Sequence, residues 1–242
     1  VAPDLPAAVD LTAFDEGGAA AEPGRFQGPA AGRRVGGGKG GRGQGPKTWP
    51  TREERDARRE DRARAQAEQI AADPVGVARE ICLRQLEVGP RTRQELALAL
   101  ARKGVPDEAA AQVLGRFAEV GIIDDALFAS MWVSSRHRGR GLAGRALSQE
   151  LRRKGVDDEL VREAVGALDP AVEAETARSL VRRKLASTRG LATDARVRRL
   201  AGMLARKGYG AGLAFRIVRE ELEREGTDPP ELSFDALQAL DD

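Results

Sequence analysis

The sequence predicts an all-α protein of three tandem three-helix repeats in an elongated array, preceded by a Gly- and Arg-rich arm without stable structure. From residue 73 onward, apolar residues recur at helical spacing, and no segment shows the alternation of a half-buried strand. A cluster of leucines followed by Lys-Gly occurs three times, with Lys103, Lys154 and Lys207 separated by 51 and 53 residues. A repeat of this length is typical of stacked modules that share part of their core with their neighbours.

The first 50 residues are expected to form a disordered arm. Between residues 24 and 47 there are 10 glycines and 6 basic residues, with no acid and few large apolar side chains. Such a segment buries too little apolar surface to offset its chain entropy. It is either a solvated linker or a flexible basic arm that contacts phosphates.

Residues 51–72 predict a charged, solvated helix, for which a partner-binding helix is the alternative. Thr51 and Glu54 have the spacing of a capping box, and Glu54 and Arg58 form an acid-before-base pair at i,i+4. No broad apolar stripe follows, so little of this helix needs to be buried. At the other end of the chain, residues 227–242 contain five acids and no Lys or Arg, and predict an acidic, mostly disordered tail.

The three repeats are expected at residues 73–123, 124–168 and 169–226. Each begins with an aspartate suited to capping a helix N-terminus: Asp73, Asp124 and Asp169. The third repeat is about eight residues longer than the others between its first aspartate and its Lys-Gly pair, and we expect the extra residues within 187–193.

The glycine after each repeated lysine is expected to end the second helix of its repeat. A left-handed glycine at this place closes a Schellman motif, in which the following residue packs on the leucine three places before the lysine. The three glycines are Gly104, Gly155 and Gly208. Basic residues also suit the negative end of a helix dipole, which gives the neighbouring Arg-Lys pairs a structural explanation.

Composition excludes several function classes. One Cys and one His rule out a disulfide framework and any Cys- or His-cluster metal site, and we expect neither a metal nor a cofactor. Asp124 and Asp125 are interpreted as a helix cap, and Cys82 as an inert core thiol. Ser134, Ser135 and His137 lie along one helix without a placed acid or oxyanion hole, so no catalytic triad is expected.

No apolar run is long enough for a transmembrane helix, and no signal peptide is evident at the start of the sequence. We therefore expect a soluble, cytoplasmic protein, and we also expect it to be monomeric.

Charge is distributed unevenly among the repeats, whose formal net charges are zero, +1 and +5. Basic clusters in the second and third repeats are the candidate contacts for a partner or for DNA: Arg136, Arg138, Arg140, Arg152, Arg153, Lys154, Arg182, Arg183, Lys184, Arg196, Arg198 and Arg199. Two helices of a unit resemble a helix-turn-helix, but no Asn- or Gln-bearing recognition helix is evident. Sequence-independent phosphate contact is the functional interpretation, and a solvated face is the alternative.

Residues 79–219 resemble the bacterial RecX family, which regulates the RecA recombinase. The resemblance rests on Gly-Ile-Ile-Asp-Asp-Ala-Leu-Phe-Ala at 121–129, Trp-Val-Ser-Ser-Arg at 132–136 with Gly141, and Glu-Leu-Arg-Arg-Lys-Gly-Val at 150–156. It extends to Ile-Cys-Leu-Arg-Gln-Leu at 81–86, Pro-Arg-Thr-Arg-Gln-Glu-Leu at 90–96 and Lys-Gly-Tyr at 207–209. The arm is not part of the usual family pattern.

The resemblance implies a non-enzymatic regulator of tandem three-helix repeats. Proteins of this family bind in the groove of RecA–DNA filaments and inhibit ATP hydrolysis, strand exchange and coprotease activity, within recombinational repair and the SOS response. The expected partners are therefore the RecA filament and, weakly and without sequence preference, single- or double-stranded DNA. An autonomous DNA-binding protein of helix-turn-helix-like units and a plain helical scaffold remain as alternatives.

Overall fold

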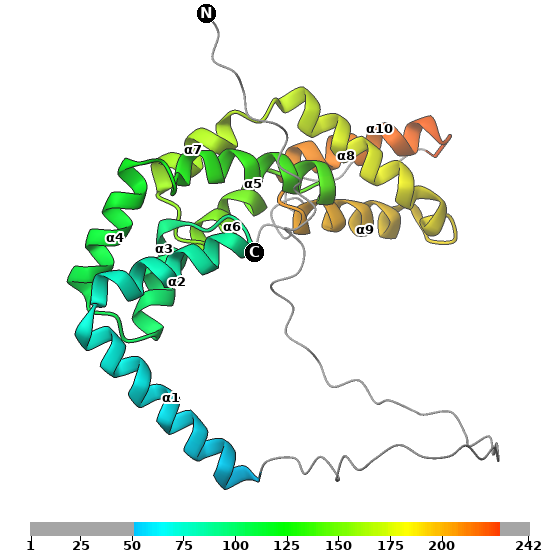
Figure 1. Cartoon of the computed structure of the whole chain (residues 1–242). Coiled ribbons are helices and arrows are strands. Elements are labelled where there is room, and N and C mark those ends of the chain that lie inside the picture. Colours follow the sequence, from blue (N-terminus) through cyan, green and yellow to red (C-terminus); the bar gives the residue numbers. More distant parts are fainter. Residues whose placement is uncertain (1–50, 228–242) are drawn as a thin grey trace, which may run out of the picture. The chain divides into compact units, whose positions relative to one another are not determined.

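The computed structural model of the chain describes residues 51–227, which are helical, with no strand among them. This confirms the predicted all-α fold (Figure 1). The expected arm at 1–50 and nearly all of the expected acidic tail lie outside the described residues. The chain divides into two compact units, and the boundary along the sequence lies between Ala72 and Asp73.

The first unit contributes one described helix, α1 (Arg52–Ala72). The helix begins with the expected capping box, because the Thr51 amide donates to Glu54 at 2.8 Å and the Glu54 amide donates to the Thr51 hydroxyl at 3.2 Å. Almost all of its side chains are exposed, as expected for a helix without an apolar stripe.

Between Asp73 and Thr227, the described part of the second unit contains nine α-helices in three successive groups. The first group is α2 (Pro74–Val88), α3 (Arg93–Arg102) and α4 (Asp107–Glu119). The second is α5 (Asp125–Arg140), α6 (Gly144–Arg153) and α7 (Asp158–Gly166). The third is α8 (Pro170–Leu185), α9 (Thr193–Arg206) and α10 (Ala211–Arg224), with a short 3-10 turn, η2 (Ala186–Thr188), in the longer connection after α8.

Aspartate side chains begin the first helix of every group. The carboxylates of Asp73, Asp124 and Asp169 each accept a hydrogen bond of 2.8 Å from a backbone amide in the first helical turn. In two of the three cases a proline follows at the first helical position, where its missing N–H costs nothing. Asp124 is thus engaged as a helix cap.

The second helix of each group supplies the centre of its core. The two repeated leucines of each helix are at most 1 % exposed: Leu96, Leu100, Leu147, Leu151, Leu200 and Leu204. Because they lie four residues apart, both project from the same face of the helix. Removing such side chains from water is the main favourable contribution to folding.

All three of these helices end in a Schellman motif. The φ angles of Gly104, Gly155 and Gly208 are +78°, +75° and +90°, in the left-handed region. The amide after each glycine donates over 3.2 Å to the carbonyl of the second repeated leucine. These bonds satisfy carbonyls that the end of a helix leaves without a partner.

The end of α6 packs against the start of α3, which joins the second group to the first. The hydroxyl of Thr92, which caps α3, donates to the Lys154 carbonyl at 2.6 Å. The Lys154 ammonium contacts Glu95, in the first turn of α3, at 2.7 Å. The negative end of one helix dipole thereby meets the positive end of the other.

The end of α9 packs in the same way against the start of α6. The Ala143 amide donates to the Lys207 carbonyl at 2.8 Å, and the Lys207 ammonium donates to the Arg140 carbonyl at 2.6 Å. A Cβ atom on Gly208 would lie 2.3 Å from the Ala146 backbone nitrogen, so only glycine fits. The Lys-Gly pair therefore links neighbouring repeats as well as ending a helix.

We expect Gly208→Ala to lower the free energy of unfolding by roughly 3 kcal/mol or more, because it combines left-handed strain with a backbone clash. Gly104→Ala is the matched control. Its φ is similar but a Cβ there meets nothing within 4 Å, so strain alone should cost about 1 kcal/mol. Urea unfolding of both variants measures the difference, and equal losses would contradict a joint that excludes a Cβ at Gly208.

Candidate functional site: a basic groove between the second and third repeats

An open groove of about 890 Å³ lies where the C-terminal end of α5 faces α8. Four cationic side chains line it, and a single carboxylate does so. The cations are Arg138, Arg140, Arg183 and Lys207, and the carboxylate is Glu175. We call this feature the basic groove.

The shape of the groove follows from the way α5 ends. Gly141 adopts a left-handed φ of +62°, which turns the chain toward α6. The buried imidazole of His137 then links the turn to α8, with Nδ1 2.8 Å from the Leu142 carbonyl and Nε2 3.0 Å from the Thr176 hydroxyl. Both ring nitrogens have partners, so His137 serves to position the groove wall.

The basic groove has a positive electrostatic field. Burial lowers the pKa of Lys207, and the neighbouring Arg183 and Arg140 charges lower it further. The carboxylate of Glu175 is shared with two arginines outside the groove, at 3.5 Å from Arg178 and 3.4 Å from Arg182. Such a site favours an anionic partner.

Three of the twelve sequence-predicted basic residues, Arg138, Arg140 and Arg183, meet in this groove. Lys207 is a fourth groove residue, which the sequence places only at the end of a helix. Its repeated Lys-Gly context predicts the helix end but carries no signal of the residues that surround it in space. Four other candidates are exposed but lie outside the groove lining: Arg153, Lys184, Arg198 and Arg199. Arg152 is also exposed and pairs with Asp158 at 2.6 Å.

Two predicted contact residues, Arg136 and Lys154, instead pack on the ring of Trp132. The Arg136 guanidinium carbon is 4.2 Å and the Lys154 ammonium 4.4 Å from the ring centroid. The indole N–H donates to Glu150 at 2.9 Å, and Arg136 lies 3.8 Å from the same carboxylate. These charges are committed to the interior contacts of the second repeat and its joint with the first.

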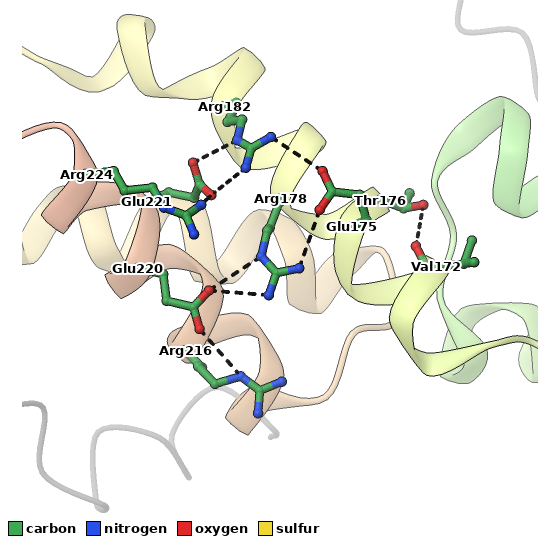
Figure 2. Close-up of polar contacts among 9 residues, drawn as sticks. All are labelled: Val172, Glu175, Thr176, Arg178, Arg182, Arg216, Glu220, Glu221 and Arg224. Carbon is green, nitrogen blue, oxygen red and sulfur yellow. Dashed lines mark hydrogen bonds and ion pairs between the residues drawn. The ribbon is translucent and has the colours of Figure 1, made fainter.

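Arg182 belongs to an ion-pair network between α8 and α10 (Figure 2). Its guanidinium donates twice to Glu221, at 2.9 and 3.1 Å. One turn away, Arg178 lies 3.4 Å from Glu220. The Glu221 side chain is only 4 % exposed and also pairs with Arg224, so Arg182 neutralises a largely buried charge.

Arg196 is a correction to the sequence-based expectation of a contact surface. The residue is 5 % exposed, pairs with Glu225 and donates to Thr188 at 3.3 Å and Thr227 at 3.2 Å. It therefore ties η2 to the end of α10 inside the third repeat. The hydrogen bond from Arg196 holds the pKa of Glu225 below its ordinary value, and Arg189 contributes in the same direction.

Between residues 51 and 227, no group of three or more His, Cys, Asp or Glu side chains could hold a metal ion. In the same range, no helix is both long enough and apolar enough to cross a membrane. The thiol of Cys82 is buried, and burial raises its pKa to about 11.

These features define a class, the tandem three-helix-repeat proteins, here with a basic groove between two repeats. Family models for the first, second and third three-helix domains of RecX match residues 78–117, 124–165 and 171–218. The chain belongs to the RecX family.

Curated relatives agree with the family models. A protein of Thermobifida fusca named Regulatory protein RecX is 64 % identical over 151 residues, which cover 62 % of this chain and 82 % of the relative. Its namesake in Streptomyces coelicolor is 58 % identical over 170 residues, covering 70 % and 90 %. A crystal structure of RecX from Lactobacillus salivarius shares the fold, with a TM-score of 0.58 at 17 % identity over 62 % of this chain and 97 % of that one.

We expect Glu221→Gln to lower the free energy of unfolding at neutral pH by roughly 1–3 kcal/mol, because it removes the charge that Arg182 faces. Hydrogen bonding from Arg182 holds the pKa of Glu221 below its ordinary 4.5. A depressed carboxyl pKa stabilises the fold above the unfolded value and loses that contribution as the pH falls through the folded value. The difference between the variant and the unaltered chain should therefore shrink in acid.

Urea unfolding at pH 7 and about pH 3.5 measures this difference. Glu223→Gln is the control, since Glu223 forms only an exposed i,i+4 pair with Arg219 at 2.9 Å and should contribute below about 0.5 kcal/mol. A Glu221→Gln difference that is the same at both pH values would contradict the role of this ion pair.

Proposed function

We propose that the chain is a non-enzymatic regulator of RecA that binds the RecA–DNA filament and inhibits its ATP hydrolysis, strand exchange and coprotease activity. The observation that carries the proposal is the ordered match of three RecX domain models to the three helix groups, together with relatives named as regulatory proteins. On this proposal, the chain acts as a monomer in the cytoplasm, in recombinational repair and the SOS response, without a cofactor.

The basic groove is the surface we propose for contact with the filament. A RecA–DNA filament presents phosphates and carboxylates, and the groove gathers four cations around one engaged carboxylate. Exposed charges of this kind chiefly speed association and select the partner. Arg182 is not part of this proposed surface, because its guanidinium already pairs with Glu175 and Glu221. Reversing its charge would place a carboxylate against both and would disturb the fold.

The first test is the DNA-dependent ATP hydrolysis of RecA from the same bacterium during titration with the chain. We expect inhibition well below one copy per RecA monomer. The absence of inhibition, with tight and salt-dependent DNA binding by the chain alone, would contradict the proposal and favour an autonomous DNA-binding protein.

The contact surface is tested by Arg138→Glu combined with Arg183→Glu. Both side chains are exposed, so the fold should persist while the concentration needed for inhibition rises roughly tenfold. Arg58→Glu with Arg59→Glu, on exposed positions of α1, gives the same change in net charge away from the groove. Equal inhibition by both double variants would show that the groove is not the contact.

A further inference from the structure

The basic groove has the chemistry of a docking site for a peptide that is both acidic and apolar. Its four cations surround exposed and half-buried apolar surface from Val172, which is 50 % exposed, and Leu142. Two hydroxyl-bearing residues of the groove lining, Thr176 and Ser179, lie on α8 between Val172 and Arg183. A free phosphate would use the cations alone, whereas an acidic peptide with apolar side chains would use both kinds of surface.

The segment 228–242 of the same chain has the complementary composition. Its five acids are Asp228, Glu231, Asp235, Asp241 and Asp242, and it contains no Lys or Arg. Large apolar residues lie between these acids: Leu232, Phe234, Leu237 and Leu240. The groove offers four cations around one carboxylate, whereas Arg152 and Arg178 outside it each face a carboxylate of their own.

The segment starts close enough to reach the groove. Thr227, the last described residue, bonds to Arg196, which also contacts Thr188 just beyond the C-terminal end of α8. The groove runs along α8 from Arg183 back to Val172, a distance of about 16 Å at 1.5 Å per residue. Fifteen residues can span up to about 50 Å when extended, so the reach is sufficient.

We propose that residues 228–242 dock in the basic groove of their own chain and shield it from other anionic partners. Binding requires the acids and the groove cations together, and salt weakens it because exposed charges are screened. A partner then gains access in proportion to the fraction of chains whose groove is open. This inference goes beyond the proposed function and is tested without a recombinase, so either can fail alone.

Docking is measured by paramagnetic relaxation in the full chain with a nitroxide on Ser233→Cys. The one native cysteine, Cys82, stays unlabelled because it is buried and its thiol pKa is about 11. We expect broadening of the amide signals of Thr176, Ser179 and Arg183 at low salt. No broadening, or broadening confined to residues outside the groove, would overturn the proposal.

Two charge-matched variants identify the cause of docking. Changing the five acids of 228–242 to their amides should abolish the broadening. The same change at five acids of α1 should leave it intact: Glu53, Asp56, Glu60, Asp61 and Glu68. Broadening that survives in the tail variant would refute a charge-driven contact, and broadening of an isotope-labelled chain by a separate spin-labelled chain would assign the groove to a second copy.

Shielding is measured by the binding of a fluorescent oligothymidylate to both variants. If the segment occupies the groove in most chains, the tail variant should bind about three- to tenfold more tightly than the α1 variant. Both variants carry the same net charge, so a general electrostatic gain cancels. Equal affinities would overturn the shielding.

Discussion

The joint between consecutive repeats depends on one recurring contact. In this contact, the C-terminal end of the second helix of one repeat meets the N-terminal start of the second helix of the repeat before it. At Lys154 and at Lys207, the carbonyl that the helix leaves open accepts a hydrogen bond from the N-cap residue of the second helix in the preceding repeat, Thr92 or Ala143. The same two lysines extend their ammonium groups across the joint. One short sequence thus ends a helix, aligns two dipoles and joins two modules.

In the first repeat, the glycine of the Lys-Gly ending packs against no other repeat among the described residues. Gly104 closes its Schellman motif as the others do, yet a Cβ atom there would meet no other atom within 4 Å. At Gly208 the backbone of α6 fills that space. The glycine is therefore needed for backbone conformation in all three repeats, and for close approach where another repeat precedes it.

Arginine in this chain has two physical roles that composition does not separate. Arg182 neutralises a carboxylate that is 4 % exposed and so ties α8 to α10 (Figure 2). Arg196, on α9, neutralises a carboxylate that is 18 % exposed at the end of α10. Arg138 and Arg183 instead face an open groove with few acids. A buried ion pair that is broken on one side leaves an uncompensated charge, so we expect substitutions of Arg182 or Arg196 to act on folding. Substitutions of Arg138 or Arg183 should instead act on the proposed contact with a partner.

The sequence by itself determined the helices, their caps and their threefold recurrence, because leucine spacing, N-terminal aspartates and Lys-Gly endings act within one or two helical turns. It also separated α1 from the repeats by the absence of an apolar stripe. Only the tertiary structure decided which basic residues share a surface: Lys207 joins Arg140, 67 residues earlier, while Arg196 turns inward to Glu225. Those choices depend on how helices from different repeats pack, and a local pattern carries no information about a neighbour so distant in the chain.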